Sequence, residues 1–311
     1  MNCIKTAYGK IPVKEVKIEK IAEYPRISLP NYLSTFRNNA IDKKSQPILV
    51  KLKNKSCESE LQELQKTKNG KYILLTAEYF RVRCSPHRIT LPRYLNPKLA
   101  YLIGYLYGDG GLKDIRRSYK TTGVFEHKLI VGDEFQLQIE RIKSLFKELF
   151  NLHTTLRTER IDKGENMYYL NPTCKLIYRL LVKVFDFPEG PKRNLAVPKL
   201  IRKAPKRIRQ WFLRGFIDAD GDTRATEYYL TSALPSPRIK IKLADKRLVL
   251  YLKNMLNEDF NLGFTGPYSD TKKDYYIQTA KAGTIRANKR NLFKHPIKKW
   301  RLEKFVSLMG R

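Results

Sequence analysis

The 311-residue chain has few acidic side chains, histidines and cysteines. It carries 30 Asp and Glu against 62 Lys and Arg, which leaves a formal net charge of +32. The four cysteines lie far apart without C-x-x-C spacing, and there are only four histidines, so the pattern argues against a zinc finger or a disulfide framework. The longest near-apolar stretch, residues 99–108, is about half as long as a bilayer span requires.

The N-terminal residues, MNCIKTAYGK, lack the apolar core of a secretory signal. We therefore expect a cytoplasmic protein, associated with the nucleoid in a prokaryote, that has no membrane partner. A charge of this size makes a compact protein repel itself unless a polyanion neutralises it. Residues 1–95 carry +11 and the rest carries +21, so the charge is not confined to a basic tail. Charge alone would allow two partners, nucleic acid first and an anionic membrane surface second, and the motifs described below favour nucleic acid.

The pattern of apolar and charged residues divides the chain into three parts. Residues 1–94 alternate apolar and charged side chains over 13–21 and 47–55, and an apolar stretch at 70–76 follows the turn signal Asn69-Gly70. These patterns predict short strands and a small β-rich N-terminal domain. Two further units, residues 95–205 and 206–311, each predict the order helix-strand-strand-helix-strand-strand-helix. In the first unit, residues 116–133 are expected to form two strands. The fold class predicted for the whole chain is α+β with an internal repeat.

The repeat contains a paired motif, LIGYLYGDG at 102–110 and LRGFIDADG at 213–221. In each helix two small residues stand four apart and therefore share one face, which allows two helix backbones to approach closely. These helix-interface residues are Gly104 and Gly108 in the first copy and Gly215 and Ala219 in the second. Packing the two helices side by side brings their ends together.

Each motif ends in a carboxylate, Asp109 or Asp220, and the two lie 111 residues apart. The glycines that follow are expected to close the helices in the left-handed conformation. Two acids at the negative ends of two helix dipoles are electrostatically unfavourable. A shared divalent cation would offset that cost.

The two motifs resemble those of the LAGLIDADG homing endonucleases, in the form where both half-domains lie on one polypeptide. The resemblance covers residues 97–311. It implies two αββαββα half-domains that form a saddle-shaped sheet on the DNA major groove. It further implies a monomer with internal pseudo-two-fold symmetry.

The same resemblance implies the site residues. Asp109 and Asp220 become the catalytic acids that hold Mg²⁺, with Mn²⁺ able to substitute, and the carbonyls of Gly108 and Ala219 complete the metal sites. A basic residue near each acid would position or activate water. Lys192, within GPKR, is the choice for one site, and Lys298 or Lys299, within HPIKKW, for the other, with Lys299 selected. All three lysines could instead be plain phosphate contacts.

Two more aspartates, Asp133 and Asp245, end equivalent predicted strands. By resemblance they help to organise solvent, and by local pattern they cap the helices that follow. Basic side chains on the predicted strands are candidates for DNA binding, since Arg and Lys contact guanine edges and phosphates. They could also be solvated strand faces. These residues are Arg116, Arg117, Lys120, Lys128, Arg224, Arg238, Lys240 and Lys242. Lys240 and Lys242 share one face by alternation, so we expect them to contact DNA together.

The N-terminal part has a second, smaller resemblance. Cys3 and the stretch 69–82 are similar to the opening cysteine and the G-x-x-I-x-x-T-x-x-H segment of intein splicing domains. Thr76 keeps its place in that pattern, but Tyr79 stands where the histidine belongs. The sequence also has no terminal His-Asn pair, so self-splicing is not expected. The alternative is an unrelated small domain that extends contact with DNA.

Three functions follow from these observations. The first is a Mg²⁺-dependent, site-specific endonuclease that cuts both strands of double-stranded DNA in the middle of a long recognition site. The second is an RNA-binding maturase that helps a host intron to fold. The third is a non-catalytic DNA-binding protein of the same fold, although such a protein typically loses an acid and gains a helix-turn-helix, and neither change is found in this sequence.

Overall fold

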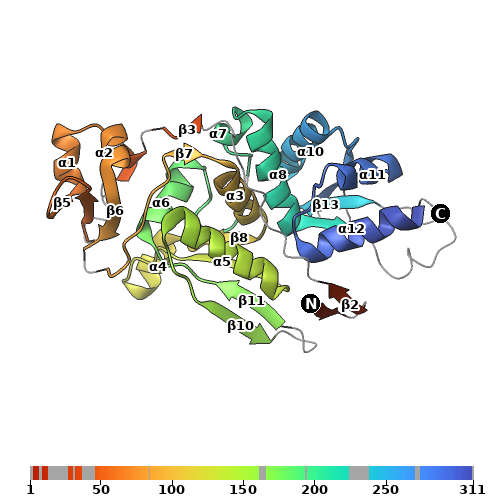
Figure 1. The fold of residues 1–311 in the computed structure, drawn as a ribbon, viewed down its shortest axis with the longest axis horizontal. Helices are drawn as coiled ribbons and strands as arrows, with labels where there is room; N and C mark the ends of the chain where they lie inside the picture. Colours follow the sequence, from red (N-terminus) through yellow and green to blue (C-terminus); the bar gives the residue numbers. More distant parts are fainter. Residues whose placement is uncertain are drawn as a thin grey trace.

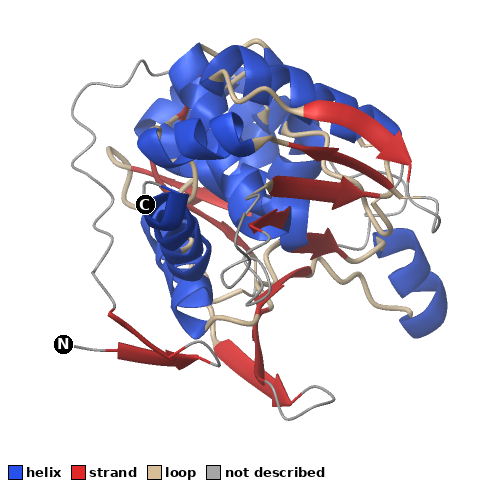
Figure 2. Ribbon diagram, turned by 90° about the vertical axis from the view of Figure 1, so that its right-hand side faces the viewer, coloured by secondary structure: helices blue, strands red, loops and turns tan. Residues whose placement is uncertain are grey.

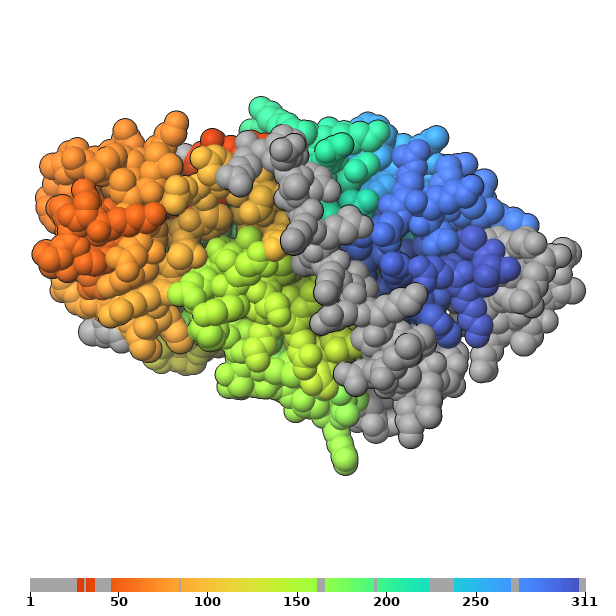
Figure 3. All heavy atoms as spheres, viewed as in Figure 1, coloured from red at the N-terminus to blue at the C-terminus, as the bar shows by residue number. Residues whose placement is uncertain are grey.

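The computed structural model describes residues 3–6, 9–12, 27–30, 32–36, 46–83, 85–160, 166–192, 195–223, 238–269 and 274–309. Helices α1 and α2 of the N-terminal part lie at one end, the second half of the repeat lies at the other end, and the first half lies between them (Figure 1). The space-filling view shows the same order from orange through green to blue (Figure 3). Among the described helices, none is long and apolar enough to span a membrane.

The first half of the repeat is built around α3, a helix buried on all sides, as expected when apolar residues surround the whole helix. Asn96 caps its start by accepting a hydrogen bond from Leu99 N. The elements in order are α3 (Pro97–Asp109), β8 (Gly110–Leu112), α4 (Ile115–Thr122), β9 (Leu129–Asp133), α5 (Gln136–Phe150), β10 (Leu156–Arg160), β11 (Asn166–Leu170) and α6 (Lys175–Val184).

Among the described residues, the second half follows the same order except that it lacks a counterpart of α4 and has two additional helices, α7 and α12. Its elements are α7 (Lys199–Arg202), α8 (Lys206–Asp220), β12 (Gly221–Thr223), β13 (Ile239–Leu243), α10 (Lys246–Phe260), β14 (Thr265–Ser269), β15 (Tyr275–Gln278), α11 (Lys281–Lys289) and α12 (Pro296–Met309). The expected terminal helix is thus two helices, α11 and α12, and Pro205 separates the short α7 from α8.

The two halves have the same sheet topology. The first sheet has the strand order β10-β11-β9-β8, and the second has β14-β15-β13-β12, with all pairs antiparallel. Helix α5 packs against β9, β10 and β11, and α10 packs against β13, β14 and β15, so one face of each sheet is covered. Figure 2 shows strands running beside the central group of helices. The predicted α+β class and its internal repeat are therefore present.

The N-terminal part contains helices as well as strands. Its elements are β1 (Cys3–Thr6), β2 (Gly9–Pro12), β3 (Ile27–Ser28), the 3₁₀ helix η1 (Leu33–Phe36), β4 (Ile48–Leu52), β5 (Glu58–Glu60), α1 (Leu61–Thr67), α2 (Gly70–Thr76), β6 (Ala77–Val82) and β7 (Tyr94–Leu95). The strand expected within 47–55 is β4. The strand expected at 13–21 lies outside the described residues.

Two predicted strands are helices in the structure. Residues 70–76 form α2 because Asn69, which marked a turn, caps a helix by accepting from Tyr72 N at 2.8 Å. Residues 115–122 form α4 because Asp114 caps its start and Gly123, at φ +68°, ends it in the left-handed conformation. In both places a polar residue that signals a turn also satisfies the free N–H groups of a helix.

The central contact of the molecule is the packing of α3 on α8 (Figure 1). A Cβ added to Gly104 would lie 2.0 Å from the carbonyl oxygen of Phe212, and one added to Gly215 would lie 2.0 Å from that of Tyr101. Tyr101 and Phe212 occupy equivalent positions in the two motifs, so the contact is reciprocal. The two helix backbones touch with no side chain between them.

The glycines after the acids act differently from the prediction. Gly110 has φ −80° and Gly221 has φ −76°, so both are extended and lead directly into β8 and β12. The expected left-handed conformation is wrong. Glycine is needed there because a Cβ would lie 2.6 Å from the carbonyl oxygen of Leu106 or Ile217 in the preceding turn.

We predict that Gly104→Ala or Gly215→Ala lowers the free energy of unfolding by about 3 kcal/mol, because the added methyl meets rigid backbone on the opposite helix. Chemical denaturation would measure the loss. Gly111→Ala is the matched control, since nothing lies within 4 Å of its added Cβ. Equal stability of the Gly104 and Gly111 variants would contradict the close contact.

Candidate active site

The ends of α3 and α8 bring Asp109 and Asp220 together. Each acid is the last residue of its helix and directly precedes an edge strand, β8 or β12. A Cβ on Gly108 would lie 2.3 Å from the Cβ of Ala219 and 3.2 Å from Oδ2 of Asp220. Gly108 and Ala219 therefore continue the close helix contact down to the two carboxylates.

Two lysines lie at the same helix ends in equivalent ways. Lys192 Nζ donates to the carbonyl oxygen of Tyr107 at 3.0 Å and to that of Gly108. Lys298 Nζ donates to the carbonyl oxygens of Asp218 and Ala219 at 2.6 and 2.5 Å. These carbonyls occupy equivalent positions in the two motifs. Each lysine thus satisfies free carbonyls at a helix C-terminus, where a cation is favourable.

Lys299, selected from the sequence, is not at this position. Its Nζ lies 3.8 Å from Oε1 of Glu303 on the same helix. Lys298 is the structural counterpart of Lys192. The sequence held no signal for this choice, because α12 begins at Pro296 and its first turn contains both lysines.

Burial disturbs the protonation of both acids, and at Asp109 the charge of the neighbouring acid adds to it. The pKa of Asp109 is raised to about 7, first because protein atoms surround the carboxyl group and second because Asp220 lies beside it. Water still reaches Asp109 and screens part of this effect. Burial also raises the pKa of Asp220, which Lys192 and Lys298 oppose. Burial lowers the pKa of Lys192, while Asp220 and Asp109 act in the opposite direction.

The donor set fits a divalent metal ion. Two carboxylates whose negative charges disfavour each other supply the hard oxygen ligands that Mg²⁺ prefers, and Mg²⁺ needs only one or two carboxylates when substrate phosphates complete its coordination. No cluster of three or more His, Cys, Asp or Glu suitable for a metal is present in the described part of the chain. The carbonyls of Gly108 and Ala219, expected as metal ligands, each accept a hydrogen bond from a lysine.

The strand-end aspartates differ in their partners. Asp245 caps α10, with Oδ1 accepting from Arg247 N and Leu248 N. Asp133 accepts from Phe135 N at 2.8 Å through Oδ1 and from the Tyr105 hydroxyl at 2.5 Å through Oδ2. Asp133 also belongs to the surroundings of Asp109, whose pKa it helps to raise.

On the second sheet the predicted basic residues share a face. Ile239 and Ile241 of β13 are buried under α10, while Lys240 and Lys242 point to the other face. Lys240 Nζ lies 3.9 Å from the ring centroid of Tyr276, and Lys242 Nζ lies 3.2 Å from Oδ2 of Asp274. Arg238 is exposed just before this strand, and Arg224 lies outside the described residues.

On the first half the predicted residues are placed differently. Arg116, Arg117 and Lys120 are exposed on α4 rather than on a strand. Lys128, partly buried, forms an isolated bridge with Thr173 next to β9. The open face of the first sheet therefore carries less of the expected charge. The basic side chains beside it lie on a helix inserted between β8 and β9.

The residues of the intein-like resemblance have ordinary structural contacts. The Thr76 hydroxyl donates to the carbonyl oxygen of Tyr72 within α2, and the Tyr79 hydroxyl donates to Glu58 at 2.9 Å. Cys3 begins strand β1. Among the described residues, none of these contacts supports splicing chemistry.

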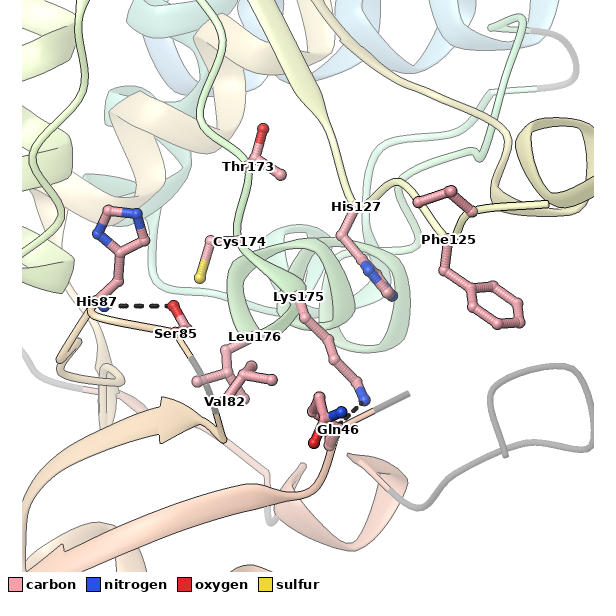
Figure 4. A pocket seen from close by; sticks show the side chains of 11 residues that line it. Gln46, Val82, Ser85, His87, Phe125, His127, Thr173, Cys174, Lys175 and Leu176 are labelled. Atoms are coloured by element: carbon pink, nitrogen blue, oxygen red, sulfur yellow. Dashed lines mark hydrogen bonds between the residues drawn. The ribbon is translucent and has the colours of Figure 1, made fainter. Parts of the chain in front are cut away.

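A separate cavity of about 360 Å³ lies between the N-terminal part and the first half (Figure 4). Lys175 crosses it and donates to the carbonyl oxygen of Gln46 at 3.2 Å. Burial raises the pKa of the Cys174 thiol and lowers that of His127 to about 4. The uncharged forms are therefore favoured, which suits a packing seam and not a nucleophilic centre.

No family model matches the chain. Among curated proteins, the probable translation initiation factor IF-2 of Methanocaldococcus jannaschii is 28% identical over 200 residues, which are 61% of this chain and 14% of that protein. The glutamine–fructose-6-phosphate aminotransferase of the same organism is 27% identical over 141 residues, 44% of this chain and 11% of that protein. The chain thus spans only a small fraction of the length of these relatives.

Solved structures with a similar arrangement include a variant of the homing endonuclease I-DmoI, at 20% identity and a TM-score of 0.47, covering 67% of this chain and 98% of that one. The homing endonuclease I-WcaI bound to its DNA recognition sequence has 18% identity and a TM-score of 0.48, covering 66% and 85%. The N-terminal LAGLIDADG domain of DUF199/WhiA has 11% identity and a TM-score of 0.40, covering 68% and 81%. All three TM-scores are below 0.5, so these likenesses by themselves assign no function to the chain.

We predict that the metal-free protein loses stability as the pH rises from about 4 to about 7. An acid whose pKa is raised by folding binds more protons in the folded state than in the unfolded state over this window, so deprotonation favours unfolding. Asp109→Asn removes this contribution. Thermal unfolding of both proteins across the pH range would therefore show the variant gaining stability relative to the wild type toward pH 8. A difference that does not change with pH would contradict the raised pKa.

Proposed function

We propose that the protein is a metal-dependent endonuclease that cuts both strands of double-stranded DNA at a specific site. The observation that carries this proposal is the symmetric cluster at the ends of α3 and α8, with one acid and one lysine from each half of the chain. A net charge of +32 provides the attraction to a polyanion. Two equivalent sets of reacting groups match the two strands of a duplex.

The chemistry of phosphodiester hydrolysis explains the residue types. A water molecule attacks phosphorus, and negative charge grows on the non-bridging and leaving oxygens. Asp109 and Asp220 would hold Mg²⁺, which when bound supplies an activated water and neutralises this charge. Lys192 and Lys298, already fixed at the helix ends, would stabilise the same charge through their ammonium groups.

The comparisons with curated proteins are consistent with an independent module. The matched proteins bear the names of a translation initiation factor and an aminotransferase, and the match covers 14% and 11% of their lengths. Neither named activity accounts for a likeness that is confined to so small a part of each protein. This supports a function that belongs to the matched part itself.

A test of this proposal requires a DNA substrate that is identified by binding and not by cleavage. A randomised pool of duplexes, selected for binding to the metal-free protein, would yield the recognition site, which is then placed in a supercoiled plasmid. With Mg²⁺, or with Mn²⁺ in its place, the protein should convert this plasmid to linear DNA. Intact plasmid despite tight binding to the selected site would reject the nuclease in favour of a non-catalytic binding protein.

We predict that Asp109→Asn and Asp220→Asn abolish linearisation while binding persists, because each removes an oxygen ligand but not the fold. Lys298→Ala should slow cleavage by about 100-fold, the usual effect of removing one group that stabilises transition-state charge. Lys299→Ala is the matched control, with the same charge change one residue away, and should cut near the wild-type rate. If the two lysine variants slow cleavage equally, Lys298 is only one of many phosphate contacts.

We predict that duplex affinity falls by about 1,000-fold between 50 and 200 mM salt, as for a protein that makes six or more phosphate contacts. The double variant Lys240→Ala, Lys242→Ala should reduce the steepness of this dependence by about 1 to 2 in the log–log slope. Lys143→Ala, exposed on the helix that covers the other face of the first sheet, is the control. Fluorescence anisotropy measures all three, and a slope unchanged in the double variant would remove that strand face from the DNA interface.

A further inference from the structure

Histidine 295 occupies an unusual place, at the start of the helix that carries Lys298. It immediately precedes α12, and its carbonyl oxygen accepts the first helical hydrogen bond, from Lys299 N at 2.9 Å. Its Nδ1 lies 3.2 Å from Ile297 N and 3.4 Å from Lys298 N, so the ring accepts from the free N–H groups of the first turn. It therefore acts as the N-cap, a position usually held by Ser, Thr, Asp or Asn.

The other ring nitrogen explains why a histidine stands there. Because Nδ1 accepts two N–H groups, the ring hydrogen is assigned to Nε2. Nε2 is fully buried and lies 3.5 Å from Oδ2 of Asp133, and no shorter polar contact is found for it within the described ranges. A serine or asparagine could cap the helix but could not also reach a carboxylate on the opposite side.

Asp133 is itself held in place by the first half. Oδ1 accepts from Phe135 N and Oδ2 from the Tyr105 hydroxyl of α3. Burial would raise the pKa of Asp133, but the contacts with His295, Tyr105 and Phe135 N together outweigh it and hold the pKa below its ordinary value. A fixed carboxylate of the first half thus faces the cap of a helix that belongs to the second half.

Asp245, the equivalent aspartate of the second half, contacts a segment of the first half. Asp245 uses Oδ1 to cap its own helix, and Oδ2 accepts from Leu195 N at 2.7 Å. Leu195 is buried and follows Lys192 by three residues. Asp245 of the second half therefore holds the segment that carries the lysine next to α3 of the first half.

We propose that Asp133 and Asp245 are positioning residues, and that each fixes the backbone of a segment carrying one of the two site lysines. Asp133 acts through His295 on Lys298, and Asp245 acts directly on the segment of Lys192. Each half therefore aligns a lysine-bearing segment by its strand-end carboxylate. The importance of this alignment for cleavage rests on the proposed nuclease function, but the alignment itself can be measured without DNA or metal.

Two isosteric variants separate the contacts. Asp245→Asn keeps an acceptor oxygen for the cap of α10 but presents an N–H₂ group to Leu195 N, which is also a donor. Asp133→Asn keeps the acceptor for Phe135 N and likewise presents a donor to the Nε2 hydrogen of His295. Both substitutions leave the side-chain volume almost unchanged. Asp245→Asn removes one contact, whereas Asp133→Asn also removes the acceptor of the Tyr105 hydroxyl, which shares Oδ2 with His295.

The measurement is the rate of reductive methylation of each lysine amine, followed by peptide mass spectrometry. In the wild type Lys192 and Lys298 should react more slowly than Lys299, because their amines are hydrogen-bonded to carbonyls. Asp133→Asn should speed the reaction of Lys298 by about tenfold, the order expected when a polar contact to a carboxylate is lost, and leave Lys192 unchanged. Asp245→Asn should speed the reaction of Lys192 and leave Lys298 unchanged.

A second route tests the role of His295. His295→Asn keeps a cap acceptor for α12 but cannot reach Asp133, so it should expose Lys298 to the same extent as Asp133→Asn. The double variant Asp133→Asn, His295→Asn should label Lys298 no faster than either single variant, because both changes break the same contact between Asp133 and His295. This variant keeps the proposal testable if Asp133→Asn does not fold. Additive effects, equal rises at both lysines, or unchanged labelling in folded variants would overturn the proposal.

Cleavage gives an independent arm when the wild type is active. Asp133→Asn and Asp245→Asn should both accumulate nicked circles from a plasmid bearing the selected site, since only one lysine is misplaced in each. Sequencing the nick should show opposite strands for the two variants, and the same strand in both would overturn the assignment. An inactive wild type would instead reject the nuclease proposal, while the labelling result would still decide the positioning roles.

Discussion

The direct contact between the backbones of α3 and α8 is the constraint on which the rest of the structure depends. It requires glycine at positions 104 and 215, because any side chain would meet a carbonyl oxygen of the other helix. Once the axes are this close, the helix ends must meet, and Asp109 and Asp220 are forced into one place. The electrostatic cost of that meeting explains the other polar groups nearby, since both lysines lie at the carbonyls of the same helix ends.

The site is therefore a balance of unfavourable and favourable charges. Burial, and at Asp109 also the charge of Asp220, raises the pKa of each acid, and the lysines reduce this effect without removing it. The position of both acids at helix C-termini is unfavourable for negative charge as well. A site left with unneutralised negative charge is prepared for a cation. Buried hydrogen bonds keep the helix end next to Asp220 in place. Asp218 accepts one from the Tyr101 hydroxyl and one from Lys294 N.

Part of this architecture could be predicted from the sequence. The repeat, the small residues on one helix face and the two acids follow from spacing alone, because helical periodicity places residues four apart on one side. The strand predictions after Asn69 and Asp114 are wrong, because a residue that signals a turn can also cap a helix. The choice of Lys298 over Lys299 depends on which side of α12 meets α8. The partner of His295 could not be predicted either, because Asp133 is 162 positions away in sequence and no periodicity links the two.

The position of α12 in chain order has a consequence for synthesis. Asp109, Lys192 and Asp220 leave the ribosome before Lys298, and the segment that bears Lys298 docks onto groups of the first half that are already made. A nascent chain therefore holds both acids and one lysine before α12 is complete. Whatever chemistry the full cluster performs is assembled only when translation reaches that helix.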